Sequence, residues 1–275
     1  MTGIFIFTRD RPLQLDACLR SLKENAPQLS APTVLARWTS DRFEEGYEIL
    51  VSEHPDVEFV FETNFEQDVR AILPTLPEHT LFLCDDSITF RPLPADPVDA
   101  LTDDVISFSL RIGRNTRYCH PRNLWHDQPE SMEERGEFLV WEWAESPEGD
   151  VFAYHGKEGD FGYPYSLDGV VHRVSCIIEW IGGKGFENPN RMEGAVLSTM
   201  RTDVRPKLSA YHESVQVGIP VNAVNTLVLN RVGVDFPQST DDLNDLYLAG
   251  KRIDYKAMDF TDVNGSFKEM PLLVA

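Results

Sequence analysis

Strand-like and helix-like segments alternate through the first 100 residues of this 275-residue chain. Short apolar stretches lie at residues 4–7, 33–36, 57–61 and 80–83. The segments between them carry apolar residues at helical spacing, as Leu15, Cys18 and Leu22 do in the first. Strands separated by helices of this length pair in parallel through right-handed crossovers. The alternation therefore predicts an α/β fold with a mostly parallel central sheet flanked by helices.

The pattern changes after residue 97. Further elements are indicated there: a strand at 105–110, a hairpin joining 138–143 to 151–154, and helices at 174–181, after 190 and at 241–249. No internal repeat or low-complexity linker separates these parts from the first 100 residues. We therefore expect a single domain, residues 1–275, with two functional halves.

Composition excludes several classes of partner. With 25 Lys and Arg against 45 Asp and Glu, the formal net charge is −20, which should repel nucleic acids and anionic membranes. The N-terminus lacks the basic stretch of a signal peptide, and no segment approaches the ~18 consecutive apolar residues of a transmembrane helix. The four cysteines are far apart, which favours free thiols in a reducing compartment. We expect a cytoplasmic protein.

Two adjacent carboxylates, Asp85 and Asp86, follow the apolar stretch at residues 80–83. Thr8 and Arg9 follow the first stretch in the same way, and ligands of open α/β sheets bind beyond the carboxyl ends of the strands. Adjacent like charges repel unless a proton or a cation separates them, and carboxylate oxygens suit Mg²⁺ or Mn²⁺. The pair indicates either a site for a divalent cation or a solvated acidic turn.

Two stretches resemble the GT-A-fold glycosyltransferases of family 2. FLCDDSITF (residues 82–90) stands where that family has an acidic D-x-D-like motif on its fourth strand. IFIFTRDRPLQLDACLRSL (residues 4–22) matches the pattern R-x-x-x-L-x-x-x-L-x-S-L that opens the first helix of the family, with the matching positions Arg11, Leu15, Leu19, Ser21 and Leu22.

The resemblance implies a site for a nucleoside-diphosphate sugar, the donor substrate. In it, Asp85 and Asp86 would bind Mn²⁺ or Mg²⁺, and Asp85 would also contact the donor. The first turn would line the same donor site through Thr8, Arg9 and Arg11. Ser87 departs from the family because it stands where the motif usually has its last acid, so the metal site would either be weaker or rest on Asp86 alone.

The end of the second strand also departs from the family. Its usual acid, which contacts the nucleotide base, is replaced by the sequence Arg37-Trp38-Thr39-Ser40-Asp41. Here Trp38 would stack on the base, and Asp41 would take the place of the acid.

Residues 166–194 resemble the acceptor-binding part of the same family. The matching positions are Asp168-Gly169, Arg173, Gly185-Phe186-Glu187 and Glu193. The resemblance implies that Glu193 is the general base of an inverting transfer, with Asp168 as second candidate, and that Arg173 contacts the donor. Partial burial would raise the pKa of such a base toward the working pH. Alternatively, Glu193 is an acid in the first turn of a helix, favoured there by the helix dipole.

Other residues permit two interpretations each. Arg111, Arg114, Arg117 and Arg122 stand out in so acidic a chain and form either an anion contact or surface ion pairs. His212 is either a late metal ligand, as the resemblance suggests, or an ordinary histidine. Several aromatic residues of the middle region either stack on a sugar or pack in the core: Trp141, Trp143, Tyr154, Tyr163 and Tyr165.

These features predict a metal-dependent, inverting glycosyltransferase of the hexosyltransferase type. It would move a sugar from a nucleoside-diphosphate sugar to a hydroxyl of a glycan or another acceptor. Residues 1–100 would form the donor half, and residues 101–275 the acceptor half with a C-terminal extension. One alternative is a catalytically inactive, glycosyltransferase-like module that binds glycan or nucleotide. A haloacid-dehalogenase-like phosphatase is disfavoured, because Ser87 replaces its second acid and the motif follows the fourth strand.

Overall fold

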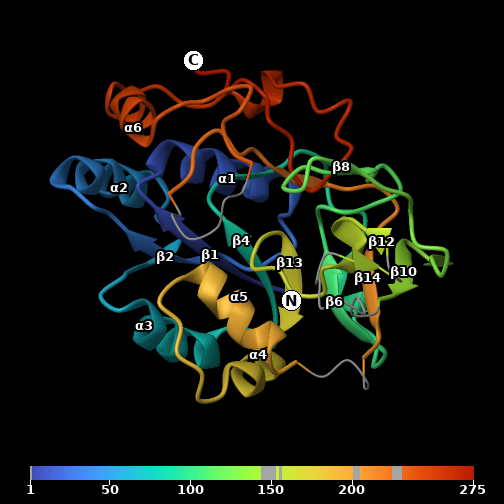
Figure 1. Cartoon of the computed structure of the whole chain (residues 1–275). Helices are drawn as coiled ribbons and strands as arrows, with labels where there is room; N and C mark the ends of the chain where they lie inside the picture. The colour runs from blue at the N-terminus through green and yellow to red at the C-terminus, as the bar shows by residue number, and fades with distance from the viewer. Residues whose placement is uncertain (1, 144–152, 155–156, 201–204, 225–230) are drawn as a thin grey trace.

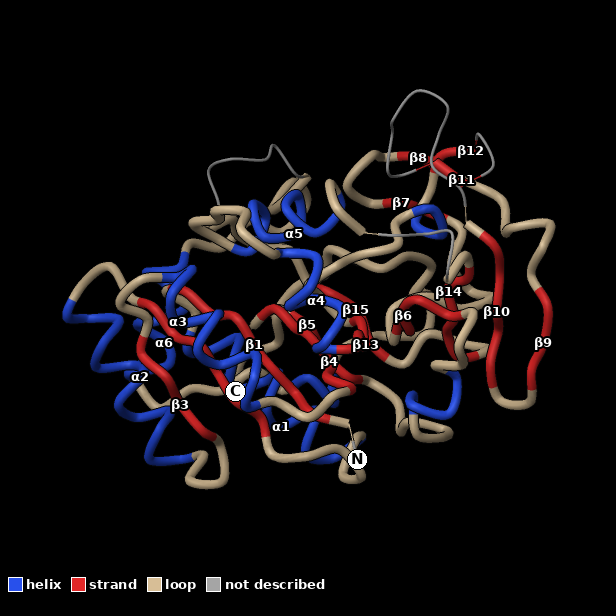
Figure 2. The backbone as a smooth tube through the Cα atoms, turned by 90° about the horizontal axis from the view of Figure 1, so that it is seen from below, coloured by secondary structure: helices blue, strands red, loops and turns tan. Residues whose placement is uncertain are grey.

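The protein is built on one nine-stranded sheet. The computed structural model describes residues 2–143, 153–154, 157–200, 205–224 and 231–275. The strand order is β3-β2-β1-β4-β13-β6-β14-β10-β9, with β3 and β9 at opposite edges (Figure 2). The strands are β1 (Gly3–Arg9), β2 (Pro32–Arg37), β3 (Glu58–Phe61), β4 (His79–Cys84), β6 (Val105–Ser109), β9 (Glu133–Arg135), β10 (Phe138–Glu142), β13 (Val170–Arg173) and β14 (Lys207–Tyr211).

Most strands of this sheet point the same way. Parallel pairing joins β1 to β2 and β4, β2 to β3, and β6 to β14. Only β13 and β10 run antiparallel to both of their neighbours, so seven of the nine strands share one direction. The predicted α/β class, with a mostly parallel central sheet flanked by helices, is confirmed.

Helices cover both faces of the sheet (Figure 1). On one face, α1 (Pro12–Asn25), α2 (Asp41–Glu53) and α6 (Thr240–Leu248) share an apolar core with Ile4 and Ile6 of β1. On the other, α3 (Phe65–Ile72), α4 (Val174–Ile181) and α5 (Pro189–Leu197) share a core with Phe5 and Phe7. The alternation of side chains along β1 therefore supplies both cores. Single 3₁₀ turns complete the helical structure: η1 (Leu73–Thr75), η2 (Pro97–Ala100), η3 (Asp160–Gly162) and η4 (Tyr255–Ala257).

The elements predicted for the first 100 residues form as expected, and so do the three later helices. Asn64 caps α3 by accepting a hydrogen bond from the Gln67 amide at 3.0 Å. The predicted hairpin is wrong: β10 pairs with β14 and β9, because its buried apolar residues lie inside the main sheet. Its turn, residues 144–150, lies outside the described residues. Three small ribbons complete the fold: β5 (Ser87–Thr89) with β15 (Gln216–Gly218), β7 (Tyr118–Cys119) with β8 (Leu124–Trp125), and β11 (Ala153–Tyr154) with β12 (Lys157–Glu158).

The antiparallel strand β13 determines what meets at the carboxyl end of β4. Because β13 runs opposite to β4, the residues that precede β13 lie where β4 ends. The Gly169 amide donates to the Phe82 carbonyl at 2.8 Å, and the Gly169 carbonyl accepts from the Leu110 amide at 2.8 Å. This turn therefore brings Asp168 beside the segment that carries Asp85 and Asp86.

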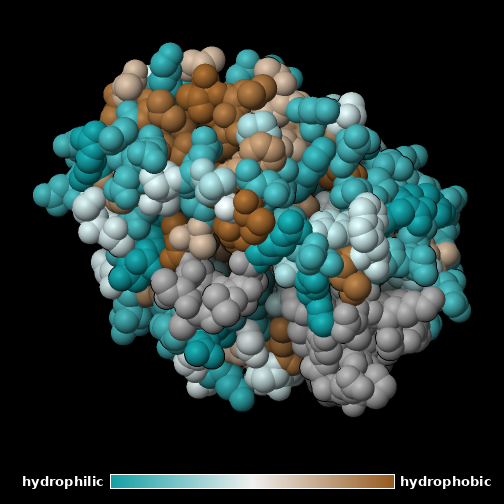
Figure 3. All heavy atoms as spheres, turned by 45° about the horizontal axis from the view of Figure 1, so that its top comes forward, coloured by the Kyte–Doolittle hydropathy of each residue, from teal (hydrophilic) through white to brown (hydrophobic). Residues whose placement is uncertain are grey.

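Hydrophilic residues cover most of the face in Figure 3, with one larger hydrophobic area near its upper left. Across the described ranges, no helix is both long and apolar enough to cross a membrane. All four cysteines are free thiols.

Candidate active site

A cavity of about 620 Å³ opens at the carboxyl ends of the parallel strands. Its lining draws on elements far apart in the sequence, including β1, β4, the turn before β13, α5 and the C-terminal region. Of the predicted site residues, the lining contains Thr8, Arg9, Arg11, Asp85, Asp86, Asp168 and Glu193. The fold therefore brings together residues from both predicted halves.

One guanidinium group lies between the two adjacent carboxylates. Arg11 Nη1 donates to Asp85 Oδ1 at 2.8 Å and to Asp86 Oδ2 at 3.1 Å. All three side chains are largely buried, with exposed fractions of 7%, 3% and 11% for Arg11, Asp85 and Asp86. Burial raises the pKa of Asp86 to about 7, because the attraction of Arg11 only partly offsets the loss of hydration. The solvated-turn interpretation is therefore wrong for this pair.

The turn residues around Arg11 support this arrangement. The Arg9 amide donates to Asp85 Oδ2 at 3.2 Å, whereas the Arg9 side chain remains partly exposed. Thr8 and Tyr47 share a hydrogen bond of 2.7 Å through their hydroxyl groups. The turn at residues 8–11 thus binds Asp85 through the backbone amide of Arg9 and the side chain of Arg11.

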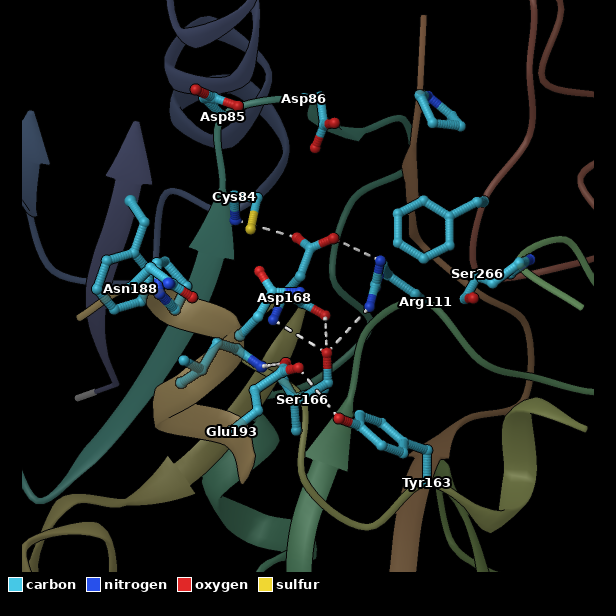
Figure 4. A pocket seen from close by; sticks show the side chains of 18 of the residues that line it. Cys84, Asp85, Asp86, Arg111, Tyr163, Ser166, Asp168, Asn188, Glu193 and Ser266 are labelled. Carbon is cyan, nitrogen blue, oxygen red and sulfur yellow. Dashed lines mark hydrogen bonds and ion pairs between the residues drawn. The ribbon is translucent and has the colours of Figure 1, made fainter. Parts of the chain in front are cut away.

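Asp168 forms the centre of a second buried cluster (Figure 4). Its Oδ1 accepts from the Cys84 amide at 3.0 Å and from Ser87 Oγ at 2.7 Å, and its Oδ2 accepts from Arg111 Nη1 at 2.5 Å. The Arg111 guanidinium also lies over the Phe267 ring, 4.5 Å from its centroid. Both carboxylate oxygens of Asp168 are thus engaged, and Ser87, the departure from the family motif, orients this carboxylate.

Gly169 provides the space that this cluster needs. Its φ of +72° is a left-handed conformation, and an added Cβ would lie 2.6 Å from Arg111 Cγ. Gly169→Ala should therefore lower the free energy of unfolding by about 1–3 kcal/mol, measured by urea denaturation. The matched change Gly183→Ala meets no atom within 4 Å and should not destabilise the protein. Equal stability of the two variants would contradict the steric role of Gly169.

Glu193 is a carboxylate of the cavity with a raised pKa, as Asp86 is. Its Oε1 accepts from the Leu167 amide at 2.7 Å, and its Oε2 accepts from the Tyr163 hydroxyl at 3.0 Å (Figure 4). Burial raises the pKa of Glu193 to about 7, and these two hydrogen bonds offset only part of the shift. Because α5 begins at Pro189 and has no acid in its first turn, the helix-dipole alternative for Glu193 is wrong.

Trp38 and Asp41 are absent from the described lining, although they were predicted to contact the base. The Trp38 ring packs instead against Tyr47 and Phe61, at centroid distances of 5.9 and 5.1 Å. Asp41 is exposed in the first turn of α2. The side chains that line this part of the cavity are Leu35, Arg37, Glu62 and Phe65. Strand alternation explains the difference, since Leu35 and Arg37 share one face of β2 and Trp38 follows on the other.

Arg173 and His212 also lie outside the described lining. Arg173 pairs with His79 at the amino end of β4, and its Nη1 donates to the Val105 carbonyl at 2.8 Å. Arg173 therefore lies at the opposite end of the strands from Asp85. The His212 ring nitrogen Nε2 lies 2.9 Å from the Gly136 carbonyl, beside the β9–β10 turn.

The remaining candidates divide between the cavity and the rest of the molecule. Arg111, Trp141 and Tyr163 line the cavity. Arg114 forms an exposed ion pair with Glu134 at 2.6 Å. Trp143 and Tyr165 are buried in the core, and the Tyr154 side chain lies outside the described part of the chain.

Sequence reasoning missed several lining residues of the C-terminal region, among them Asn222, Ser266 and Phe267. The Lys268 amide donates to the Gly218 carbonyl at 3.0 Å, which fixes this segment beside β15. These residues match no motif, so only their position in the fold identifies them.

We compared the sequence and the structure of this chain with those of known proteins. No family model matches the chain. The bifunctional glycosyltransferase pgtA of Dictyostelium discoideum is 22% identical over 307 residues, which cover 97% of this chain and 38% of that protein. The chain thus spans less than two fifths of the length of this curated relative.

Solved structures, one of them of a mannosyltransferase, share part of this fold at low TM-scores. The mannosyltransferase PcManGT of Pyrobaculum calidifontis, in complex with GDP-Man and Mn²⁺, gives a TM-score of 0.40 at 14% identity, covering 76% of this chain and 53% of that one. TarS of S. aureus gives 0.43 at 12% identity, covering 78% and 59%. Over nearly its whole length, the chain is thus similar in sequence to part of a glycosyltransferase.

Proposed function

We propose that this chain transfers a sugar from a nucleoside-diphosphate sugar to a hydroxyl group of an acceptor, with inversion at the anomeric carbon. One observation carries the proposal: a single cavity is lined by two buried arginines, Arg11 and Arg111, and by Glu193, whose carboxylate is oriented by Tyr163 and the Leu167 amide and whose pKa is raised by burial. Arginine N–H groups suit the oxygens of a diphosphate. A carboxylate with this pKa suits the removal of a hydroxyl proton near neutral pH.

In the proposed reaction Glu193 is the general base. It accepts the proton of the acceptor hydroxyl while the acceptor oxygen attacks the anomeric carbon from the face opposite the diphosphate. The bond between that carbon and the phosphate oxygen breaks, and its electron pair leaves with the nucleoside diphosphate. Tyr163 and the Leu167 amide orient the carboxylate of Glu193 through their hydrogen bonds. Arg11 and Arg111 are assigned to the phosphate oxygens.

The resemblance also implies a Mn²⁺ or Mg²⁺ ion on Asp85, Asp86 and His212, but the contacts of these residues do not fit one. Asp85 Oδ1 and Asp86 Oδ2 accept from Arg11, and Asp85 Oδ2 accepts from the Arg9 amide. His212 lies outside the described lining of the cavity. Within the described ranges, no three His, Cys, Asp or Glu side chains gather as metal ligands. We therefore assign no step of the transfer to a metal.

The proposed donor site predicts that nucleoside diphosphates bind in the cavity. A panel of nucleoside diphosphates and their sugars should raise the thermal unfolding temperature of the wild type. Calorimetry should then show affinity weakened about tenfold in Arg111→Lys, because lysine lacks the planar fork that meets phosphate oxygens. The matched variant Arg114→Lys changes an exposed ion pair of the same segment and should bind like the wild type.

Failure of every nucleotide in the panel to bind would contradict the proposed function. Binding that is equal in the two arginine variants would contradict the role of Arg111. An assay for release of the sugar to water or to an acceptor distinguishes the two functions: an active enzyme releases the sugar, and the inactive binding module does not.

A further inference from the structure

Arg11 occupies the position that a cation would take between Asp85 and Asp86. Its Nη1 donates to both carboxylates, at 2.8 and 3.1 Å, and its Nη2 donates to the Asn222 carbonyl. An arginine guanidinium stays protonated in proteins, and here two carboxylates face it at hydrogen-bond distance. The group is therefore a permanently charged member of the site.

The backbone and its neighbours hold this side chain in place. Arg11 precedes α1, whose first residue is Pro12, and the Arg11 amide donates to the Tyr47 hydroxyl at 3.3 Å. Asn222 is tied in turn to α1, because Gln14 Nε2 donates to Asn222 Oδ1 at 3.2 Å. The guanidinium is thus anchored at the residue's own backbone and at the segment that faces it.

A divalent ion at this pair would have to displace a buried guanidinium. Removing one partner of a buried, hydrogen-bonded ion pair is strongly unfavourable, because the other charge is left without compensation. Within the described residues, Asp86 Oδ1 is the carboxylate oxygen of the pair without a hydrogen bond, which offers a metal one free ligand atom. A metal ion at this position would therefore gain few protein ligands, which would not offset the cost of displacing the Arg11 guanidinium from the two carboxylates.

Arg11 also retains donors for a phosphate. A guanidinium has five N–H groups, and the contacts above use three of them. Its Nε is buried without a hydrogen-bond partner among the described residues, and so is Arg111 Nε. Two arginines with unused donors therefore border the same cavity.

We propose that Arg11 is the resident cation of the Asp85–Asp86 pair, in place of a divalent metal. For the identity of the ligand this inference rests on the proposed function: a nucleoside diphosphate binds beside Arg11 and Arg111 without Mn²⁺ or Mg²⁺. The statement about the metal does not depend on that ligand.

Titration with Mn²⁺ alone tests the metal statement. The wild type should bind Mn²⁺ at least about tenfold more weakly than Arg11→Met, since methionine frees both carboxylates while retaining an apolar stem. The gain should disappear in the double variant Arg11→Met with Asp86→Asn. Arg42→Met, which removes an exposed arginine paired with Asp245, should match the wild type. Wild-type affinity equal to or higher than that of Arg11→Met would overturn the proposal.

Two further measurements keep the test decisive if Arg11→Met fails to fold. Arg11→Lys keeps the charge and should bind Mn²⁺ as weakly as the wild type, whereas tighter binding by this variant would count against Arg11 as the resident cation. The wild type should bind its best nucleoside diphosphate with affinities within about threefold in EDTA and in Mn²⁺, and a tenfold dependence on Mn²⁺ would overturn the proposal. If no nucleoside diphosphate binds in either buffer, the proposed function fails, while the Mn²⁺ titration still decides the role of Arg11.

Discussion

Glu193→Gln should lower the rate of sugar transfer about 10²- to 10⁴-fold and leave donor binding nearly unchanged. Glutamine has the same shape and can still accept from the Leu167 amide, but it cannot take up the proton of an acceptor hydroxyl. The measurement is kcat for transfer, or for donor hydrolysis, together with the Kd of the nucleoside diphosphate. The matched change Glu179→Gln alters an exposed glutamate of α4 and should leave kcat unchanged.

The pH dependence provides a second readout of the same residue. Because a general base acts when ionised, the wild-type rate should fall as the pH drops below about 7, the pKa of Glu193. Burial raises this pKa, so the carboxyl group favours the folded state at low pH, and that contribution is lost as the pH rises through about 7. Glu193→Gln should consequently be no less stable than the wild type at pH 8. Full activity of this variant at every pH would exclude Glu193 as the base.

Asp168→Ala should reduce the free energy of unfolding by about 3–5 kcal/mol, the largest stability effect that we expect at this site. The change leaves the charge of Arg111 buried without its partner, and it removes the acceptor of the Cys84 amide and of Ser87. Ser87→Ala removes a single neutral donor and should cost only about 1 kcal/mol. Urea denaturation of both variants measures the difference.

Two comparisons separate the charge of Asp168 from its hydrogen bonds. Asp168→Asn keeps an acceptor for Ser87 but loses the charge, so its stability should lie between those of the wild type and Asp168→Ala. Asp262→Ala changes an exposed aspartate and should have little effect. If Asp168→Ala were as stable as Asp262→Ala, Asp168 would not hold the cluster together.

The first 100 residues were predictable because their signals are local. Apolar spacing within each segment indicated β1 to β4 and α1 to α3, and Asn64 marked the start of α3. The carboxyl-end rule for parallel strands then placed Asp85 and Asp86 at the ligand-binding edge of the sheet. Glu193 came from the resemblance of residues 166–194 to a known family, since no local rule distinguishes it from other helix acids.

The remaining features of the site depend on strand order, which local periodicity does not contain. Ser87 and Asp168 are 81 positions apart and meet because β13 enters the sheet next to β4. The stacking of Arg111 on Phe267 joins segments more distant still. Trp38 and Asp41 were misplaced for a smaller reason, because the end of β2 presents Arg37 to the cavity and turns the next residue toward Tyr47.

The lining of the cavity extends in sequence from Phe7 to Phe267. A recombinant fragment that stopped at α5 would retain Asp85, Asp168 and Glu193, yet it would lack the ring against which Arg111 packs. One that began after β1 would lose Phe7, Thr8 and Arg9 from the lining. Truncation that reaches β1 at one end or Phe267 at the other therefore removes part of the lining of the cavity.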